Sequence, residues 1–368
     1  MLERIVCLFL VSVVVFCSVE GFCKTGEQGF LISPLLLKHS GMEMQWQLNL
    51  PVKPAEKVER LFVFDEYLYV LTDRNYILCI DRTKGALRFE QQLAVAGLPV
   101  CEPKYYGRKL SFVVGNELLV LDPAAGIVAE KRKLEGFGKG SVRGIARNSD
   151  YLYVVGSDRR IHALVAGEYW QKFSVSADND SLINSLVADD ELIIFATEAG
   201  NVVRISSDGP AKKWQFDVPG TIKAPIVRDG DGVYVGSENT KLYKIDVNTG
   251  QKVWPVDFQT GAVLTNSAVI GDKVIYQYAG DKGLYAVEKE SGRKIWQLAD
   301  SVGVLTEKGG RAYVLAKEGV LVVMDNENSE QLYSVNFAAV TRHATNMADS
   351  DMYVSDDKGR LMAIKISD

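Results

Sequence analysis

The chain has 368 residues, of which 47% are hydrophobic and 24% charged, and it contains only ten prolines. This composition is typical of a globular protein and excludes a disordered one. The formal net charge is −5, and basic residues are interspersed with acidic ones, so no basic stripe is present for nucleic acid. Length alone would suggest two domains, but the internal repeats described below overrule that estimate.

The first 21 residues have the pattern of a secretory signal peptide. Arg4 supplies a positive charge, residues 5–19 are uncharged and mostly apolar, and Val19 and Gly21 stand where small residues precede a cleavage site. We expect cleavage after Gly21. The apolar stretch is shorter than the roughly 20 residues that span a bilayer, so retention as an uncleaved anchor is the alternative.

A membrane tether through a lipid is a third outcome for this end of the chain. Cys17 and Cys23 lie where a lipidated cysteine would stand, but each follows a phenylalanine, where lipoprotein signals carry a small residue. In every case we expect an exported protein, periplasmic or associated with the outer membrane. Of the remaining cysteines, Cys79 is expected to be buried in a strand, and a disulfide between Cys79 and Cys101 is the less favoured alternative.

Residues 22–41 form a leader between the signal peptide and the first strand. They include the unusually apolar run FLISPLLL at residues 30–37. Such a run either packs over the rim of the folded domain, which we favour, or serves as a docking segment for a partner or a membrane surface.

From residue 42 onward the chain repeats one pattern: an alternating apolar run ending near an acidic residue, then a turn, then an aromatic residue. The clearest copies are residues 242–254, LYKIDVNTGQKVW, and residues 284–296, LYAVEKESGRKIW. A period of about 40 residues with strand-like units is the signature of a β-propeller, with one blade per repeat. The equivalent positions are Asp81, Asp122, Val165, Ser206, Asp246, Glu288, Asp325 and Lys365.

Each repeat contains the residues of four short strands. Residues 67–72 and 76–81 are rich in aromatic and β-branched residues, which suit a pleated, half-buried surface. A short hairpin loop joins them, and Gly85 provides the next turn because glycine tolerates a positive φ. Residues 58–64 and 87–89 add an inner and an outer strand. The sequence therefore predicts an all-β, eight-bladed β-propeller with four-stranded blades.

The last repeat lacks an outer strand, because the chain ends soon after the strand at residues 361–364. Residues 42–50 have an outer-strand sequence but no blade before them, and Trp46 occupies the aromatic position. We predict that residues 42–50 complete the last blade and close the ring, which removes two exposed sheet edges. Residues 42–368 then form a single propeller, expected to be monomeric, and an open solenoid is the disfavoured alternative.

The repeat motif resembles that of the pyrroloquinoline-quinone (PQQ) type propellers, Ala-x-Asp-x-x-Thr-Gly-x-x-x-Trp. The copy from Asp246 to Trp254 matches it at four positions, the next copy is nearly complete, and the second repeat has no aromatic residue at the final position. The resemblance implies that each aromatic residue docks against the neighbouring blade. It thereby predicts structural blade anchors at Trp46, Phe89, Trp170, Trp214, Asp246, Gly250, Trp254, Gly292, Trp296 and Tyr333.

The family includes quinone-dependent dehydrogenases, in which the resemblance would imply adjacent cysteines against the cofactor; this chain has no Cys-Cys pair and no Cys-x-x-Cys-His haem motif. Its three histidines, His39, His162 and His343, are scattered, unlike zinc ligands. The acidic spots at residues 178–180 and 229–231 fall at expected turns, which favour such residues anyway. We expect no catalytic residue, metal or cofactor, and we expect His343 to be a structural histidine with satisfied hydrogen bonds.

The expected function is that of a non-catalytic scaffold in the cell envelope. Within its family the chain resembles exported propellers that take part in outer-membrane protein assembly, which implies binding of another envelope protein through rim loops or by an added strand. Two alternatives stay open. One is a PQQ- or metal-dependent oxidoreductase, and the other is a periplasmic sensor that binds a carbohydrate or a peptide in the central channel.

Overall fold

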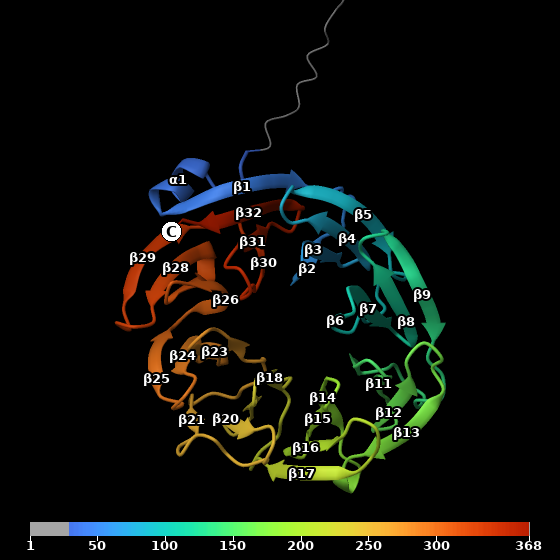
Figure 1. Ribbon diagram of the computed structural model, residues 1–368. Coiled ribbons are helices and arrows are strands. Elements are labelled where there is room, and N and C mark those ends of the chain that lie inside the picture. The colour runs from blue at the N-terminus through green and yellow to red at the C-terminus, as the bar shows by residue number, and fades with distance from the viewer. Residues whose placement is uncertain (1–28, 368) are drawn as a thin grey trace, which may run out of the picture. The chain divides into compact units, whose positions relative to one another are not determined.

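The structure is a computed structural model that describes residues 29–367. The unit formed by Leu31–Asp368 contains eight four-stranded antiparallel sheets arranged as blades around a common axis (Figure 1). The prediction of an all-β, eight-bladed propeller is confirmed. The expected signal peptide, with Cys17 and the neighbouring Cys23, lies outside the described residues.

The first four blades follow one another along the chain, each running from its inner to its outer strand. Blade 1 consists of β2 (Val58–Phe64), β3 (Tyr67–Thr72), β4 (Tyr76–Asp81) and β5 (Ala86–Gln92). Blade 2 consists of β6 (Lys104–Tyr106), β7 (Lys109–Val114), β8 (Glu117–Asp122) and β9 (Ile127–Lys133). Blade 3 consists of β10 (Gly144–Arg147), β11 (Tyr151–Val155), β12 (Arg160–Val165) and β13 (Gln171–Ser176). Blade 4 consists of β14 (Ile183–Ala188), β15 (Leu192–Thr197), β16 (Asn201–Ser206) and β17 (Lys212–Asp217).

The other four blades continue the ring, and the last one takes its outer strand from the start of the chain. Blade 5 consists of β18 (Val227–Asp229), β19 (Gly232–Gly236), β20 (Lys241–Asp246) and β21 (Phe258–Gln259). Blade 6 consists of β22 (Val269–Ile270), β23 (Val274–Tyr278), β24 (Leu284–Glu288) and β25 (Lys294–Leu298). Blade 7 consists of β26 (Ser301–Lys308), β27 (Arg311–Ala316), β28 (Val320–Asp325) and β29 (Gln331–Asn336). Blade 8 consists of β30 (Arg342–Ala344), β31 (Met352–Ser355), β32 (Arg360–Ile366) and β1 (Met42–Asn49).

The hydrophobic core lies between adjacent blades. Every residue of β3 is buried, because each blade packs a neighbour on both of its faces and its middle strands therefore read as continuous apolar runs. A representative cluster joins Ile161 of blade 3 to Ile193 and Phe195 of blade 4. The strand ladders stay within blades, so side-chain packing contributes most of the contact between blades, with single backbone hydrogen bonds from Val58 to Asp357 and from Asn346 to Leu305 crossing the two boundaries of blade 8.

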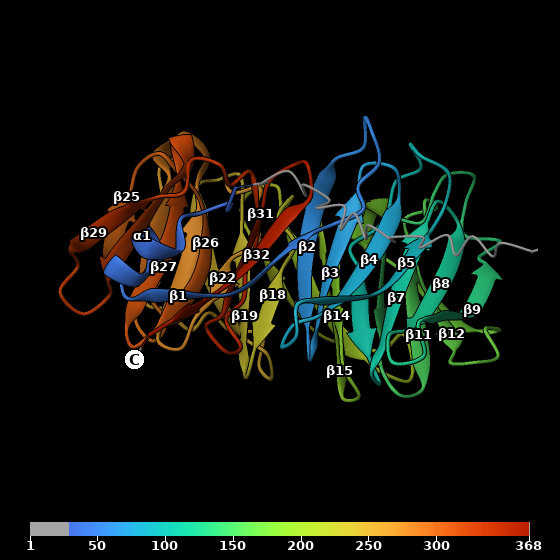
Figure 2. The ribbon, with the colours of Figure 1, turned by 90° about the horizontal axis from the view of Figure 1, so that it is seen from above.

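The ring is closed by β1, as the sequence predicts. This strand pairs antiparallel with β32 from Met42 opposite Ile366 to Asn49 opposite Arg360, with one bulge after Met44. Figures 1 and 2 show β1 running alongside β32 on the outside of blade 8. Both strand edges that an open ring would expose are therefore paired.

The C-terminal part of the leader also packs on the ring. Helix α1 (Pro34–His39) precedes β1, and Leu31, Ile32 and Leu37 are buried in a cluster with Val335 and other apolar residues of blades 7 and 8. Leu31, Ile32 and Leu37 thus pack against the folded domain as expected, whereas Phe30 and Leu35 of the same apolar run are exposed. Across residues 29–367, no helix has the length and apolar character that crossing a membrane requires.

Deletion of residues 42–50 is expected to lower the free energy of unfolding by several kcal/mol, because loss of one large buried aromatic residue alone costs about 3–5 kcal/mol and the deletion also unpairs β32. The measurement is urea unfolding of the deleted and the full protein. An unchanged unfolding midpoint would contradict closure by β1.

Candidate functional site

The outer-strand tryptophans contact the next blade around the ring. The indole N–H of Trp46 donates to the carbonyl oxygen of Arg82 at 2.7 Å, and that of Trp254 donates to the carbonyl oxygen of Lys289 at 3.2 Å. Trp214 makes the same kind of bond at 2.8 Å. Trp46 and Trp214 lie on outer strands and Trp254 lies just before β21, and each bond reaches the turn between the third and fourth strands of the next blade.

The turns that receive Trp46, Trp214 and Trp254 carry a glycine at the point of contact, whereas the turn that faces Trp296 has Ser329 at this position, with φ of 62°. Gly250 and Gly292 adopt positive φ angles of 70° and 75°, and a Cβ atom on either would lie 2.6 Å from the ring of Trp214 or Trp254. Gly85 stands in the same relation to the indole of blade 8. Glycine is therefore needed twice, for the left-handed backbone and for the close approach of the ring.

Asp246 stabilises the same turn from within. One of its carboxylate oxygens accepts hydrogen bonds from the backbone N–H of Thr249 at 2.7 Å, from the Thr249 hydroxyl at 2.9 Å and from the N–H of Asn248 at 3.0 Å. The bonds from Thr249 hold the pKa of Asp246 below its usual value. The repeated acid is thus committed to the backbone of the hairpin.

Three further predicted anchors also reach the adjacent blade or strand. Trp296 donates from its indole to the side-chain oxygen of Asn326 at 2.8 Å, and Tyr333 donates from its hydroxyl to the carbonyl of Ser40, just before β1, at 3.1 Å. Phe89 lies against the equivalent turn of blade 2. These contacts are packing and hydrogen bonding between blades.

Trp170 does not hold the position that the sequence analysis assigned to it. Its side chain is 50% exposed, and its indole donates to Glu168 in its own turn at 2.6 Å. Phe173 takes the anchor position instead: it pairs with Ala163 and packs in the core between blades 3 and 4. The assignment was wrong because Tyr169 fills the left-handed turn position, with φ of 62°, and leaves Trp170 facing outward.

Blade 2 replaces the aromatic anchor by a polar contact that the sequence analysis missed. Glu130 occupies the position, and its carboxylate accepts a hydrogen bond from the hydroxyl of Tyr169 in blade 3. Burial, followed by this bond, raises the pKa of Tyr169 to about 12. The sequence signal for this replacement is a pair of residues: Glu130 at the aromatic position of one repeat, and Tyr169 at the glycine position of the turn in the next repeat.

The substitution Trp254→Ala is expected to destabilise the protein by about 3–5 kcal/mol, since the side chain is 1% exposed and its removal leaves a cavity between blades 5 and 6. The matched control is Trp170→Ala, which should change the free energy of unfolding by less than about 0.5 kcal/mol because that indole is surface-exposed. Chemical denaturation measures both. Equal effects of the two substitutions would contradict the assignment of anchors.

Blades 6 and 7 are joined by a buried polar chain. Asn326, which accepts the bond from the Trp296 indole, donates from its side-chain amide to the hydroxyl of Tyr276 at 2.7 Å. The Tyr276 hydroxyl in turn donates to the carboxylate of Glu307 at 2.9 Å. Burial raises the pKa of Glu307 above its usual value of 4.5, despite the bond from Tyr276. The folded protein therefore binds the Glu307 proton more tightly than the unfolded chain does.

A raised carboxyl pKa in the folded state means that stability falls as the pH rises above 4.5 and the buried group must ionise. Glu307→Gln is expected to remove this fall while keeping the hydrogen bond to Tyr276. The measurement is the melting temperature of both proteins from acid to neutral pH, with the exposed Glu330→Gln as control. If the melting temperatures of wild type and Glu307→Gln changed with pH in parallel, burial of the Glu307 carboxyl would not be the cause of the pH dependence.

The closing seam carries a second polar cluster. The guanidinium of Arg82 in blade 1 donates to the hydroxyl of Tyr353 at 2.9 Å, to the carboxylate of Asp349 and to the carbonyl of Asp65. Burial opposes ionisation of Asp349, but hydrogen bonds from Asn346 and Arg82 outweigh it and hold the pKa of this carboxyl below its usual value. The cluster ties blade 8 to blade 1 in addition to the Trp46 contact.

The residues considered for metal or redox chemistry are dispersed. His162 is buried and bonded through its two ring nitrogens to Gln171 at 2.7 Å and Asp158 at 2.9 Å. Cys79 and Cys101 are unbridged thiols whose pKa values are raised by burial. In the described part of the chain, no three His, Cys, Asp or Glu side chains converge to hold a metal ion.

His343 differs from the expectation of a satisfied structural histidine. It lies on β30, and no residue between 29 and 367 forms a hydrogen bond with its ring. Burial lowers the pKa of His343 to about 4, so the imidazole is neutral at physiological pH.

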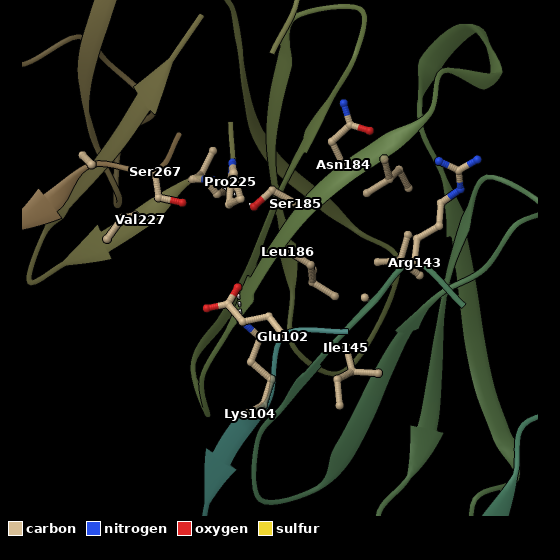
Figure 3. A pocket seen from close by; sticks show the side chains of 15 residues that line it. Glu102, Lys104, Arg143, Ile145, Asn184, Ser185, Leu186, Pro225, Val227 and Ser267 are labelled. Carbon is tan, nitrogen blue, oxygen red and sulfur yellow. Dashed lines mark hydrogen bonds and ion pairs between the residues drawn. The ribbon is translucent and has the colours of Figure 1, made fainter. Parts of the chain in front are cut away.

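A hollow of about 470 Å³ lies on the inner wall of the ring, between the innermost strands of blades 2 to 6. Figure 3 shows Arg143 on one side, Val227 and Ser267 on the other, and Glu102 and Lys104 at one end. Its apolar surface comes from buried side chains, including Ile145, Leu186 and Ile226.

Two of the polar side chains in this hollow form hydrogen bonds with the backbone, while its charged side chains remain accessible. Ser185 accepts a hydrogen bond from the backbone N–H of Ile226 at 2.9 Å, and Asn184 donates to the carbonyl of Ile222 at 2.8 Å. Lys104 forms only a 3.7 Å, solvent-exposed ion pair with the neighbouring Glu102. The guanidinium of Arg143 has no hydrogen-bonding partner within residues 29–367.

The lining of this hollow does not fit a PQQ cofactor. It has no aromatic ring, cysteine or histidine against which a planar quinone could be stacked or activated. It offers apolar side chains bordered by the charged side chains of Glu102, Lys104 and Arg143.

Comparison with known proteins decides the family. The family model described as outer membrane protein assembly factor BamB matches residues 40–254, 198–308 and 281–368, which together cover the whole ring. The chain belongs to this family. The resemblance to PQQ-type repeat propellers expected from the sequence is thereby confirmed.

Curated BamB proteins resemble the chain at low identity. The outer membrane protein assembly factor BamB of Shewanella oneidensis is 25% identical over 221 residues, and that of Yersinia pestis is 23% identical over 207 residues. The aligned regions cover 55% and 52% of the chain, and the same shares of the two relatives, so the match spans about half of their length.

Solved structures show the same fold as this member of the BamB family. BamB from Moraxella catarrhalis superposes with a TM-score of 0.65 at 13% identity, covering 88% of this chain and 97% of the other. A computationally designed protein, Ika8, gives a TM-score of 0.66 at 14% identity over 86% of this chain and 98% of its own. At these identities the likeness concerns architecture alone.

Proposed function

We propose that this protein is an exported, non-catalytic scaffold that binds another protein of the cell envelope and supports outer-membrane protein assembly. The observation that carries the proposal is the match of the BamB family model across the ring, from residue 40 to residue 368. The curated relatives bear the name of an outer membrane protein assembly factor.

The chemistry of the inner wall supports a binding role. Lys104 and Arg143 lie beside the apolar surface of Ile145 and Leu186, and a protein segment with apolar and acidic side chains would complement this combination. The sequence motif residues are used in turns and blade contacts, as Asp246 is, and so supply no acid–base pair for a reaction.

Location follows from the same proposal. The signal-peptide pattern of residues 1–21 would direct export, and the protein would act in the periplasm or at the outer membrane, tethered there if its N-terminus is lipidated or retained. A scaffold of this kind would bind its partner through rim loops, through the inner-wall hollow or by adding a strand to a blade.

Removal of the gene from the organism that carries it is expected to lower the amount of folded outer-membrane β-barrel protein, and wild-type protein should restore it. Lys104→Glu combined with Arg143→Glu should restore it poorly, because charge reversal opposes the partner at the inner wall. The control pair, Lys172→Glu with Lys213→Glu, reverses exposed charges on outer strands. Unaltered β-barrel levels after gene removal would refute the proposed role.

Purified mature protein is expected to show no PQQ-dependent oxidation of alcohols or sugars, with or without calcium. The reason is that the inner-wall hollow lacks an aromatic or cysteine platform against which the quinone could be clamped. Dye reduction monitored by absorbance measures this. Stoichiometric PQQ uptake with turnover in the range of about 1–10³ s⁻¹ would favour the oxidoreductase instead.

A further inference from the structure

A second hollow lies on the inner wall at blades 6 to 8, and it meets the first at Ser267. Its volume is about 350 Å³, at the small end of the range for ligand pockets. No Asp, Glu, Lys or Arg side chain lines it. The part of a ligand that enters this hollow must therefore be uncharged, because no side chain of opposite charge would compensate for the desolvation of an ion there.

His343 supplies an unbonded polar group to this hollow. The residue after it on β30, Ala344, is buried in the core between blades 8 and 1, so the alternation along the strand directs His343 toward blade 7. There its ring lies over Gly303 of β26, where an added Cβ atom would come within 2.8 Å of Nε2. The glycine makes room for the imidazole beside the hollow.

The imidazole is available to a ligand. It is unbonded within residues 29–367, and burial keeps it neutral, so one nitrogen donates and the other accepts. A partly buried polar group without a partner is costly, and a ligand hydroxyl would satisfy it with either polarity. Tyr278 lines the same hollow and offers both an aromatic face and a hydroxyl.

The other residues that line the hollow favour a ligand with a flat, apolar ring. Val269, Leu284, Val302 and Val304 contribute aliphatic surface. Of the other polar side chains in the lining, Tyr276 and Thr345 already use their hydroxyl groups in hydrogen bonds within the fold, while Asn266 and Ser267 lie beside the hollow. An aromatic ring with a hydroxyl group matches both the aliphatic surface and the unbonded imidazole.

We propose that the hollow at His343 binds an uncharged phenolic ring, whose hydroxyl is hydrogen-bonded to the His343 imidazole and whose ring packs on Tyr278, Leu284 and Val302. The same chemistry is presented by a free phenol and by a tyrosine side chain of a polypeptide. This inference is independent of the proposed role in outer-membrane protein assembly.

Histidine NMR tests the proposal directly, because the chain has three histidines and His343 is one resolvable signal among them. Titration of the full mature protein with N-acetyltyrosinamide should shift the ring signal of His343 saturably and leave those of His39 and His162 in place. N-acetylphenylalaninamide, which lacks the hydroxyl, should bind about tenfold more weakly, the value of one hydrogen bond. Para-cresol distinguishes a free phenol from a peptide tyrosine: tighter binding of the amide favours a polypeptide source.

Variants separate recognition from folding. His343→Phe should bind the tyrosine and phenylalanine amides equally, as measured by ligand-observed NMR, and Gly303→Ala should weaken both by displacing the imidazole. His39→Gln, exposed at the end of α1, should bind like wild type. The proposal is overturned if the His343 signal stays fixed at millimolar probe, if all three histidine signals move together, or if wild type fails to prefer the hydroxyl.

Discussion

The fold depends on one repeated contact, in which an outer-strand aromatic residue of one blade packs against a tight turn of the next. Strand pairing stops at the blade boundary, so contacts made by side chains hold most of the area between neighbouring sheets together. The contact between Trp214 and the turn at Gly250 shows why the motif has its form. The indole needs a turn without a side chain, the turn needs a left-handed residue, and the acid before it bonds the turn's N–H groups.

Closure of the ring uses the same contact together with backbone pairing. When β1 completes blade 8, it places Trp46 against blade 1, so the strand pairing with β32 and the aromatic contact form together. The Arg82 cluster and the packing of Leu37 on blades 7 and 8 add side-chain contacts on either side of β1. The joint between β1 and the rest of the ring therefore combines backbone pairing, an aromatic contact and side-chain packing.

The repeat period could be read from the sequence because each blade must present the same turn and the same apolar strands to its neighbours. The position of the aromatic anchor within a degenerate repeat is harder to predict. Phe173 follows Val165 at the same spacing as Trp254 follows Asp246, yet the more conspicuous Trp170 was taken for the anchor. The two hollows could not be predicted, since each draws its lining from the inner strands of several blades, and the partnerless state of His343 depends on its neighbours in space.

Closure by β1 is expected to make the ring one cooperative unit, rigid enough to hold the inner-wall groups in place. Native-state hydrogen exchange of the β1 and β32 amides tests this most directly, because it reports the free energy of local opening at the joint. Exchange of these amides with the same opening free energy as the amides of β3 and β15 is the predicted result. Much faster exchange confined to β1 and β32 would show that the ring opens at its joint without unfolding, and would contradict the account.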